Sequence, residues 1–417
     1  MSKFICSLPW NHLSVTPHGW VTPCCEVNWY ASDSIARNYI EVSGKEETFN
    51  IQDGVDKVIN SDSYKKIRRE MLNGDIPEAC LSCHKIEQTG GVSKRMRERP
   101  PASNLRDITQ EDGTINPDFF NVELRLGNYC NLKCRSCNAE SSTSWLDDYN
   151  KLKDKLVNQS NYDGLLQKEA IDFKWVDNMD VYTDILKYSN NLDTIHISGG
   201  EPFLVDKHSF LLDLLIEKGI SKNINIAYIT NGNYNFDKIV PILEKLKEFK
   251  GVVINFSLDD TFERNDYIRK LSNFRLIISN IHKFVSNYDF QFNITQTIHL
   301  FNFLSLEKLH LYLEEIGLYT KEHTGLIHSI NDNFVVHPAH HSPNVLPIEI
   351  RRQKIDSLEG IVEAQFLERI KKTYYNSECN NLKEVFLKSV TDVDKVRKED
   401  YKTVFPDLKE VIENETF

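Results

Sequence analysis

From residue 121 onward the chain alternates between short apolar runs rich in β-branched residues and longer amphipathic segments. This alternation limits the possible folds most strongly, because parallel strands need long crossover connections and these are usually helices. Six runs follow the pattern: 121–126 (NVELRL), 194–198 (TIHIS), 224–230 (INIAYIT), 252–258 (VVINFSL), 292–298 (FNITQTI) and 325–330 (GLIHSI). The spacing predicts an α/β fold whose parallel sheet curls into an open barrel.

Helical periodicity fills the segments between these runs. The predicted helices cover 209–218, 236–249, 265–287 and 304–316, and an extra helix over 175–188 occupies the long connection after the first run. Six strand-plus-helix units are therefore expected between residues 119 and 330.

Two segments with different sequence patterns flank this predicted core. Residues 1–118 are irregular and cysteine-rich, with one helix expected over 61–73, ended by Gly74, and a linker around Pro100 and Pro101. Residues 331–417 form a helical extension, with amphipathic helices expected over 348–357, 361–375 and 382–397. The sequence thus predicts three domains, 1–118, 119–330 and 331–417.

The charge balance excludes some classes of partner. The chain has 50 Lys and Arg residues against 61 Asp and Glu, a net charge of −11, which disfavours nucleic acid as a partner. No run of eighteen apolar residues is present, so no membrane span is expected. The N-terminus lacks an apolar run followed by a cleavage site, and we expect a cytoplasmic protein.

Nine cysteines in such a chain require an explanation. Eight of the nine lie in the first third of the sequence, and the odd total in a long chain does not suit a secreted disulfide framework. Clustered thiols in a reducing compartment indicate a metal site or catalysis.

One cluster directly follows the first predicted strand. Cys130, Cys134 and Cys137 are spaced C-x3-C-x2-C, at the carboxyl end of a strand, where α/β proteins place their sites. The three thiolates could hold a zinc ion with a fourth ligand from elsewhere. They could also hold a four-iron cluster that keeps one iron open for a small molecule.

This triplet, in this position, resembles the signature of the radical S-adenosylmethionine (radical SAM) enzymes. Ser136 departs from the family pattern, which has an aromatic residue before the last cysteine. The resemblance covers about 121–330 and implies a partial (β/α)6 barrel, a 4Fe-4S cluster held by the three cysteines, and S-adenosylmethionine as cofactor.

Further family marks occur at the later strand ends. By resemblance, Gly199, Gly200 and Glu201 in HISGGEP hold the methionine end of S-adenosylmethionine, since glycines allow close backbone approach and an ammonium group needs acceptors. Four further candidates for contact with the cofactor or substrate are Asn231, Ser257, Asp259 and Arg269. Each has a structural alternative: a turn, a helix cap or a solvated helix face.

The early cysteines form a second set. Cys6, Cys24, Cys80 and Cys83 provide four thiols, which would suit structural zinc or a closed iron–sulfur cluster. The C-x12-G-x4-C spacing from Cys6 through Gly19 to Cys24 resembles the auxiliary-cluster modules called SPASM and twitch domains, although those usually follow the barrel. The spacing selects Cys24 over Cys25, and His84 is a weaker alternative ligand.

The resemblance implies a cytoplasmic oxidoreductase-like enzyme. The cluster would cleave S-adenosylmethionine reductively to a 5′-deoxyadenosyl radical that removes hydrogen from a substrate, with an auxiliary 4Fe-4S cluster and a low-potential donor such as flavodoxin or ferredoxin. A peptide or protein side chain is the expected substrate, because the family includes peptide-crosslinking, epimerising and oxidising members. A radical dehydrogenase or epimerase of a small metabolite is the alternative. A zinc-stabilised binding protein without catalysis is the alternative from another class.

Overall fold

The computed structural model of the protein describes residues 4–29, 31–40, 45–88, 92–98, 104–153, 173–320, 325–335, 338–379 and 381–414. Contacts divide the chain into two compact units. The first comprises 1–127, 170–227 and 242–251, and the second comprises 128–169, 228–241 and 252–417. The three predicted domains follow sequence composition, whereas these units follow contacts, so the domain boundaries stay a prediction. Pro100 and Pro101 of the predicted linker lie outside the described residues.

The sheet of the first unit combines strands from both ends of its sequence. Strand β1 (His12–Val15) pairs antiparallel with β2 (Val21–Thr22) and parallel with β5 (Asn121–Leu126), which pairs parallel with β6 (Thr194–Gly199). The turn between β1 and β2 contains Gly19 at φ +80°, a left-handed conformation that favours glycine. The cysteine-rich segment therefore contributes a strand to the same sheet as the first predicted barrel strand.

Helix α3 (Asp62–Asn73) shows why the sequence pattern works in this unit. Tyr64, Ile67 and Met71 share one buried face at helical spacing, and Gly74 ends the helix at φ +98°. The prediction of a helix over 61–73 is confirmed. Other helices and the second strand pair of the unit are α1 (Leu8–Asn11), α2 (Val55–Ile59), α4 (Leu81–Gln88), α5 (Lys94–Arg97), α8 (Met179–Lys187), α9 (Ser209–Glu217), β3 (Arg37–Ile40) and β4 (Lys45–Thr48).

The second unit has its own parallel strands. Strand β9 (Gln291–Ile298) pairs with β8 (Gly251–Ser257) and with β10 (Ser329–Phe334), both in parallel. Three elements, β7 (Asn225–Thr230), α10 (Val240–Leu246) and β8, contain residues of both units. The helices of this unit are α6 (Leu146–Leu152), α11 (Phe262–Ile268), α12 (Phe274–Asn287), α13 (Leu300–Phe303), α14 (Leu306–Glu315), α15 (Ile348–Ser357), α16 (Ala364–Ile370), α17 (Lys383–Arg397), α18 (Tyr401–Val404) and α19 (Pro406–Asn414).

Two sequence predictions in this unit are wrong in detail. The single helix expected over 265–287 is two helices, because Leu271 adopts φ +76° between them and breaks the helical backbone. The strand expected over 325–330 starts at Ser329 instead, where the polar segment SINDNF pairs with β9.

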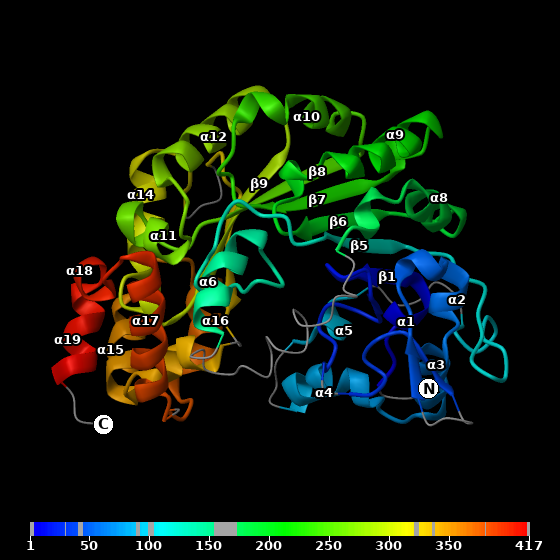
Figure 1. The fold of residues 1–417 in the computed structure, drawn as a ribbon, viewed down its shortest axis with the longest axis horizontal. Helices are drawn as coiled ribbons and strands as arrows, with labels where there is room; N and C mark the ends of the chain where they lie inside the picture. Colours follow the sequence, from blue (N-terminus) through cyan, green and yellow to red (C-terminus); the bar gives the residue numbers. More distant parts are fainter. Residues whose placement is uncertain are drawn as a thin grey trace. The chain divides into compact units, whose positions relative to one another are not determined.

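The helices after residue 331, drawn orange to red in Figure 1, pack into a core that they share with α11, β9, α13 and α14. Buried aromatic and aliphatic side chains of this core include Phe366, Tyr374, Phe386, Tyr401 and Phe405. Helix α17 lies beside α6 (Figure 1), and Val393 of α17 packs with Trp145 and Tyr149. The predicted helical extension is thus present, with α18 and α19 in addition to the expected helices.

The α/β fold class is confirmed: six strands, β5 to β10, form at or near the predicted positions with helices between them. Among the described residues, no helix has both the length and the apolar character that a bilayer crossing requires.

Candidate functional site

The loop with the three clustered cysteines lies between β5 and α6, and the turn that follows it holds its backbone. Ser144 Oγ donates to the carbonyl of Cys130 at 2.8 Å, and the indole Nε1 of Trp145 donates to the carbonyl of Cys134 at 2.8 Å. The backbone N–H of Cys137 donates to the carbonyl of Cys134 at 3.1 Å. These bonds fix the loop independently of any bound group.

Two of these thiols interact directly. A hydrogen bond with Cys137 lowers the pKa of Cys134 to about 7, and the positive charges of Arg269 and Arg397 act in the same direction. The pKa of Cys137 is raised, first by the same bond and then by burial. Because a metal centre binds the thiolate form, these opposite shifts favour ligation by Cys134 over ligation by Cys137.

Asn231, directly after β7, contacts this loop. Its Nδ2 lies 2.9 Å from Asn131 Oδ1 and 3.8 Å from Cys130 Sγ, and its Oδ1 accepts from the backbone N–H of Asn233 at 2.8 Å. The structure therefore brings Asn231 to the cysteines, as a buried side chain that orients the loop.

Asp259 and Arg269 form a buried ion pair close to the same thiols. Arg269 Nη1 lies 3.0 Å from Asp259 Oδ2, and Asp259 Oδ1 accepts from the backbone N–H of Thr297 at 2.9 Å. Burial lowers the pKa of Arg269, but the negative charges of Cys134 and Asp259 outweigh burial and raise it. Ser257 is the last residue of β8 and is half-buried, two residues before Asp259.

The Gly-Gly-Glu segment belongs to the first unit and follows β6. Gly199 has φ +127°, and a Cβ there would lie 2.6 Å from the backbone nitrogen of Leu126 on the neighbouring strand. Gly200 N–H donates to the carbonyl of Gly127 at 3.1 Å, three residues before Cys130 in the chain. The Glu201 carboxylate is fully buried and accepts from the N–H of Phe203 at 3.2 Å. Gly199 is therefore required by close packing, and Glu201 caps a local turn.

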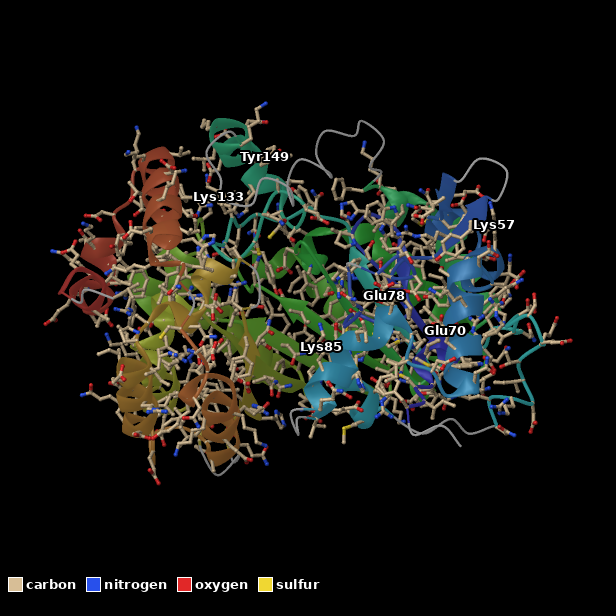
Figure 2. All side chains as sticks on the ribbon, turned by 90° about the horizontal axis from the view of Figure 1, so that it is seen from below. Lys57, Glu70, Glu78, Lys85, Lys133 and Tyr149 are labelled. Carbon is tan, nitrogen blue, oxygen red and sulfur yellow. The ribbon has the colours of Figure 1, made fainter. Side chains whose placement is uncertain are left out.

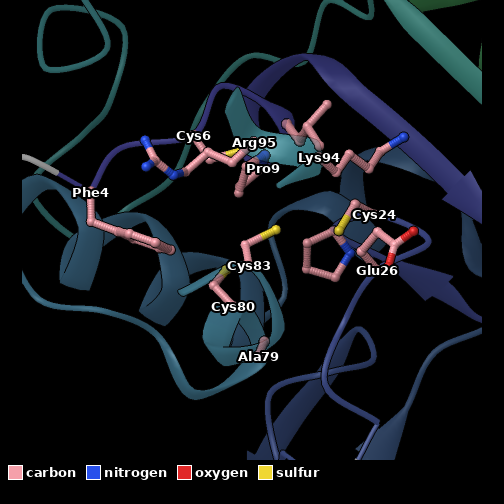
Figure 3. A pocket seen from close by; sticks show the side chains of 12 residues that line it. Phe4, Cys6, Pro9, Cys24, Glu26, Ala79, Cys80, Cys83, Lys94 and Arg95 are labelled. Atoms are coloured by element: carbon pink, nitrogen blue, oxygen red, sulfur yellow. The ribbon is translucent and has the colours of Figure 1, made fainter. Parts of the chain in front are cut away.

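The early cysteines converge on one pocket, also in the first unit. Cys6, Cys24, Cys80 and Cys83 all line it, with Lys94 and Arg95 at its edge, as Figure 3 shows. Burial raises the pKa of Cys6 to about 12, and it raises the pKa of Cys24 and Cys80 further with help from the neighbouring thiols. A group with positive charge is needed to convert such closely placed thiols into thiolates.

Cys25 has different surroundings from Cys24. It is absent from the pocket lining, and its thiol lies near Glu123, Lys94 and Arg125. His84 is also absent from the lining; its ring packs edge-on against Phe4. The pocket thus contains the four cysteines selected by spacing and neither alternative.

The donor sets fit iron–sulfur clusters. No three His, Cys, Asp or Glu side chains within the described ranges are arranged to hold a single metal ion. A cluster makes a less strict demand, because each thiolate binds a different iron. Three cysteines on one loop would leave an iron open for S-adenosylmethionine, whereas four cysteines around one pocket would close the coordination.

Sequence reasoning missed the charged residues that support the first loop. Lys133 and Arg135, between the cysteines, bind Asp148 and the pair Asp394 and Glu399. Their place inside CNLKCRSC was a visible signal, but the partners of Arg135 lie more than 250 residues further along the chain. Figure 2 shows Lys133 near Tyr149 of α6.

Comparison with known families agrees with this geometry. The family model for the Radical SAM superfamily matches residues 124–315, and the model for the SPASM iron-sulfur cluster-binding domain matches residues 6–84. The chain therefore carries a radical SAM domain, with a SPASM domain ahead of it. These domains bind S-adenosylmethionine and iron–sulfur clusters, which confirms the predicted cofactor classes. No curated protein matches the chain.

Solved structures that match the chain include native anSMEcpe with bound AdoMet, at 19% identity and a TM-score of 0.39 over 59% of this chain. The complex of anSMEcpe with AdoMet and the Cp18Cys peptide matches at 18% identity with a TM-score of 0.37, over 57% of this chain and 58% of the other. Streptococcus suis SuiB matches at 12% identity with a TM-score of 0.34, over 95% of this chain and 72% of the other. The chain spans 64% of the length of the native anSMEcpe chain.

Proposed function

We propose that the protein uses a 4Fe-4S cluster on Cys130, Cys134 and Cys137 to start a radical reaction on an organic substrate. The observation that carries the proposal is the convergence of functional side chains on this one loop. The Asn231 side chain reaches Cys130. The thiols of Cys134 and Cys137 share a hydrogen bond, and Arg269 places a buried positive charge near them. A structural zinc site does not require this combination.

When bound, the cluster supplies the electron that cleaves S-adenosylmethionine to a 5′-deoxyadenosyl radical, which removes hydrogen from the substrate. The chain's own residues bind and orient. By the family resemblance, Gly199 and Gly200 would let the cofactor approach the backbone, and Glu201 would offer its carboxylate to the ammonium group. Ser257 and Asp259, at the end of β8, are separate candidates for contact with the cofactor or substrate.

A polar strand face in the first unit supports a polar substrate. Val122, Leu124 and Leu126 of β5 are buried, whereas Glu123 and Arg125 occupy the other face, opposite His196 and Ser198 of β6. Burial opposes ionisation of Glu123, but the His12 side chain and Arg125 lower its pKa to about 2. The face thus presents fixed charges of both signs, next to the Lys94 that borders the four-cysteine pocket.

We further propose a peptide or protein side chain as the substrate and the four-cysteine pocket as an auxiliary 4Fe-4S site that accepts an electron from the substrate radical. The alternative is a small metabolite that the enzyme dehydrogenates or epimerises on the same polar face. A low-potential donor such as flavodoxin or ferredoxin would reduce the first cluster, in the cytoplasm.

Deuterium transfer separates the two substrate classes. The reconstituted enzyme would be incubated anaerobically with reductant, S-adenosylmethionine and deuterated cell extract, divided into a peptide fraction and a small-molecule fraction. We expect deuterium in 5′-deoxyadenosine only with the peptide fraction and only in enzyme that retains Cys134. Deuterium transfer from the small-molecule fraction alone would overturn the peptide proposal. If the wild-type enzyme cleaved no more S-adenosylmethionine than the Cys134→Ala variant, the proposed radical reaction would be overturned.

A further inference from the structure

The cysteine loop carries two basic side chains of its own, and both are held from outside the loop. Lys133 Nζ lies 2.8 Å from Asp148 Oδ1 on α6. Arg135 Nη2 lies 2.7 Å from Glu399 Oε2 and also pairs with Asp394. Asp394 belongs to α17, and Glu399 follows its end, more than 250 residues further along the chain.

Asp394 is fixed on both of its oxygens. Besides binding Arg135, Oδ1 accepts from the Tyr267 hydroxyl at 2.8 Å, and Oδ2 accepts from the backbone N–H of Tyr401 at 2.8 Å. The guanidinium of Arg135 stacks 3.7 Å from the centre of the Tyr267 ring. A buried carboxylate with this many donors occupies one position, so it can define the position of the Arg135 side chain.

Arg397, one turn after Asp394, reaches the other side of the loop. Its Nε lies 2.7 Å from Asp148 Oδ2, so Asp148 bridges Arg397 and Lys133. The guanidinium lies 4.4 Å from the Trp145 ring centre, and Trp145 is the residue that bonds the Cys134 carbonyl. The Arg397 side chain is fully buried, and its Nη1 and Nη2 have no hydrogen-bond partner among the described residues.

Apolar packing joins the same two helices. Val393 of α17 packs with Ala139, Trp145, Tyr149 and Leu152, and Cys137 and Val396 lie against this cluster. Lys398 ends the helix at φ +56°, a left-handed conformation that is unfavourable for a non-glycine residue. This turn separates Arg397, which points to Asp148, from Glu399, which points to Arg135.

From these contacts we propose that helix α17 of the C-terminal extension is part of the cluster site and positions the three-cysteine loop. The inference rests on the proposed function of that loop. The loop cation Lys133 pairs with Asp148, and Arg135 pairs with Asp394 and Glu399. Arg397 of α17 binds the same Asp148 on α6. A helix that served only general stability would not need to bind Arg135, between the ligand cysteines, and also Asp148, the partner of Lys133.

The test compares Arg397→Met, Arg397→Lys and Asp394→Asn with the wild-type enzyme after anaerobic reconstitution. Lys395→Met is the matched control, because Lys395 is exposed on the same helix, two residues from Arg397. Iron and sulfide per chain, the electron paramagnetic resonance (EPR) signals of each cluster with and without S-adenosylmethionine, and the urea unfolding midpoint are measured. The four-cysteine site provides an internal reference for folding.

In Arg397→Met and Asp394→Asn we expect iron to fall from about eight to about four per chain, while the auxiliary signal persists. The EPR change on adding S-adenosylmethionine should be lost, Arg397→Lys should recover part of it, and Lys395→Met should match wild type. Retention of both clusters and of the S-adenosylmethionine response would overturn the proposal. Loss of both clusters together would also overturn it, since the role would then be general stability. Absence of 5′-deoxyadenosine from the wild type would instead count against the proposed function, and the iron count would still report on α17.

Discussion

Arg269 and Asp259 form an ion pair at 3.0 Å in which the carboxylate is fully buried, directly beside Cys134 and Cys137. Removing one member of a buried pair leaves an uncompensated charge and typically costs about 3–5 kcal/mol. We therefore expect Asp259→Asn to lower the free energy of unfolding by about this amount, as measured by urea denaturation.

An exposed pair serves as the control for this substitution. Lys151 and Asp147 lie at 2.6 Å on α6, and both are largely exposed. Lys151→Met should change stability by less than about 1 kcal/mol, because exposed pairs contribute little. Equal effects of the two substitutions would contradict the structural importance assigned to Asp259 and Arg269.

Gly199 and Gly219 provide a matched test of close packing at the Gly-Gly-Glu segment. Both have positive φ, but a Cβ on Gly199 would lie 2.6 Å from Leu126 nitrogen, whereas one on Gly219 would have nothing within 4 Å. Gly219→Ala should cost about 1–2 kcal/mol through its backbone alone. Gly199→Ala should cost roughly 3 kcal/mol more and weaken S-adenosylmethionine binding, measured by equilibrium dialysis. Similar losses in both variants would argue against the tight strand contact.

Cys24 and Cys25 are adjacent in sequence but have different surroundings, so their alanine variants should differ. Cys24→Ala should lose the auxiliary cluster and retain about four irons per chain, while Cys25→Ala should retain about eight. Only Cys24 lines the pocket with Cys6, Cys80 and Cys83. Iron analysis with EPR checks this, and the reverse pattern would assign Cys25 as the ligand.

Because His208 is buried, we expect the stability of the first unit to fall in acid. Burial lowers its pKa to about 4, from 6.5 in a model peptide. Between these values the unfolded chain binds more protons than the folded chain, so stability falls as pH falls below 6.5. At pH 5 the loss is roughly 2 kcal/mol relative to pH 7.

Urea unfolding at pH 7 and pH 5 measures this loss. His208→Asn should show a smaller drop than wild type, because asparagine does not titrate in this range. His282→Asn, at an exposed position on α12, should keep the wild-type drop. An unchanged drop in His208→Asn would assign the acid sensitivity to other groups.

Local periodicity was sufficient for much of the fold. Strand β5 forms over the predicted 121–126, because apolar and polar residues alternate there and only one face is buried. The shift of the last strand to 329–334 was not visible, since its polar residues are held by backbone pairing with β9. Leu271 at φ +76° could not be anticipated either, because leucine rarely adopts that conformation.

The residues of the candidate site likewise include some that the sequence indicated and others that it did not. The cysteine spacings indicated the two ligand sets, and the strand ends indicated Asn231 and Asp259, whose roles stay a prediction. The partners of Arg135 could not be predicted, because Asp394 and Glu399 reach it only through the tertiary fold. Long-range ion pairs have no local sequence signal.

The central claim is that the chain holds two iron–sulfur clusters and cleaves S-adenosylmethionine. Anaerobic reconstitution, iron and sulfide analysis, and assay of 5′-deoxyadenosine after adding reductant and S-adenosylmethionine test it most directly. The account predicts about eight irons per chain with cleavage. Zinc in place of iron, with no 5′-deoxyadenosine formed, would contradict it and favour a zinc-stabilised binding protein.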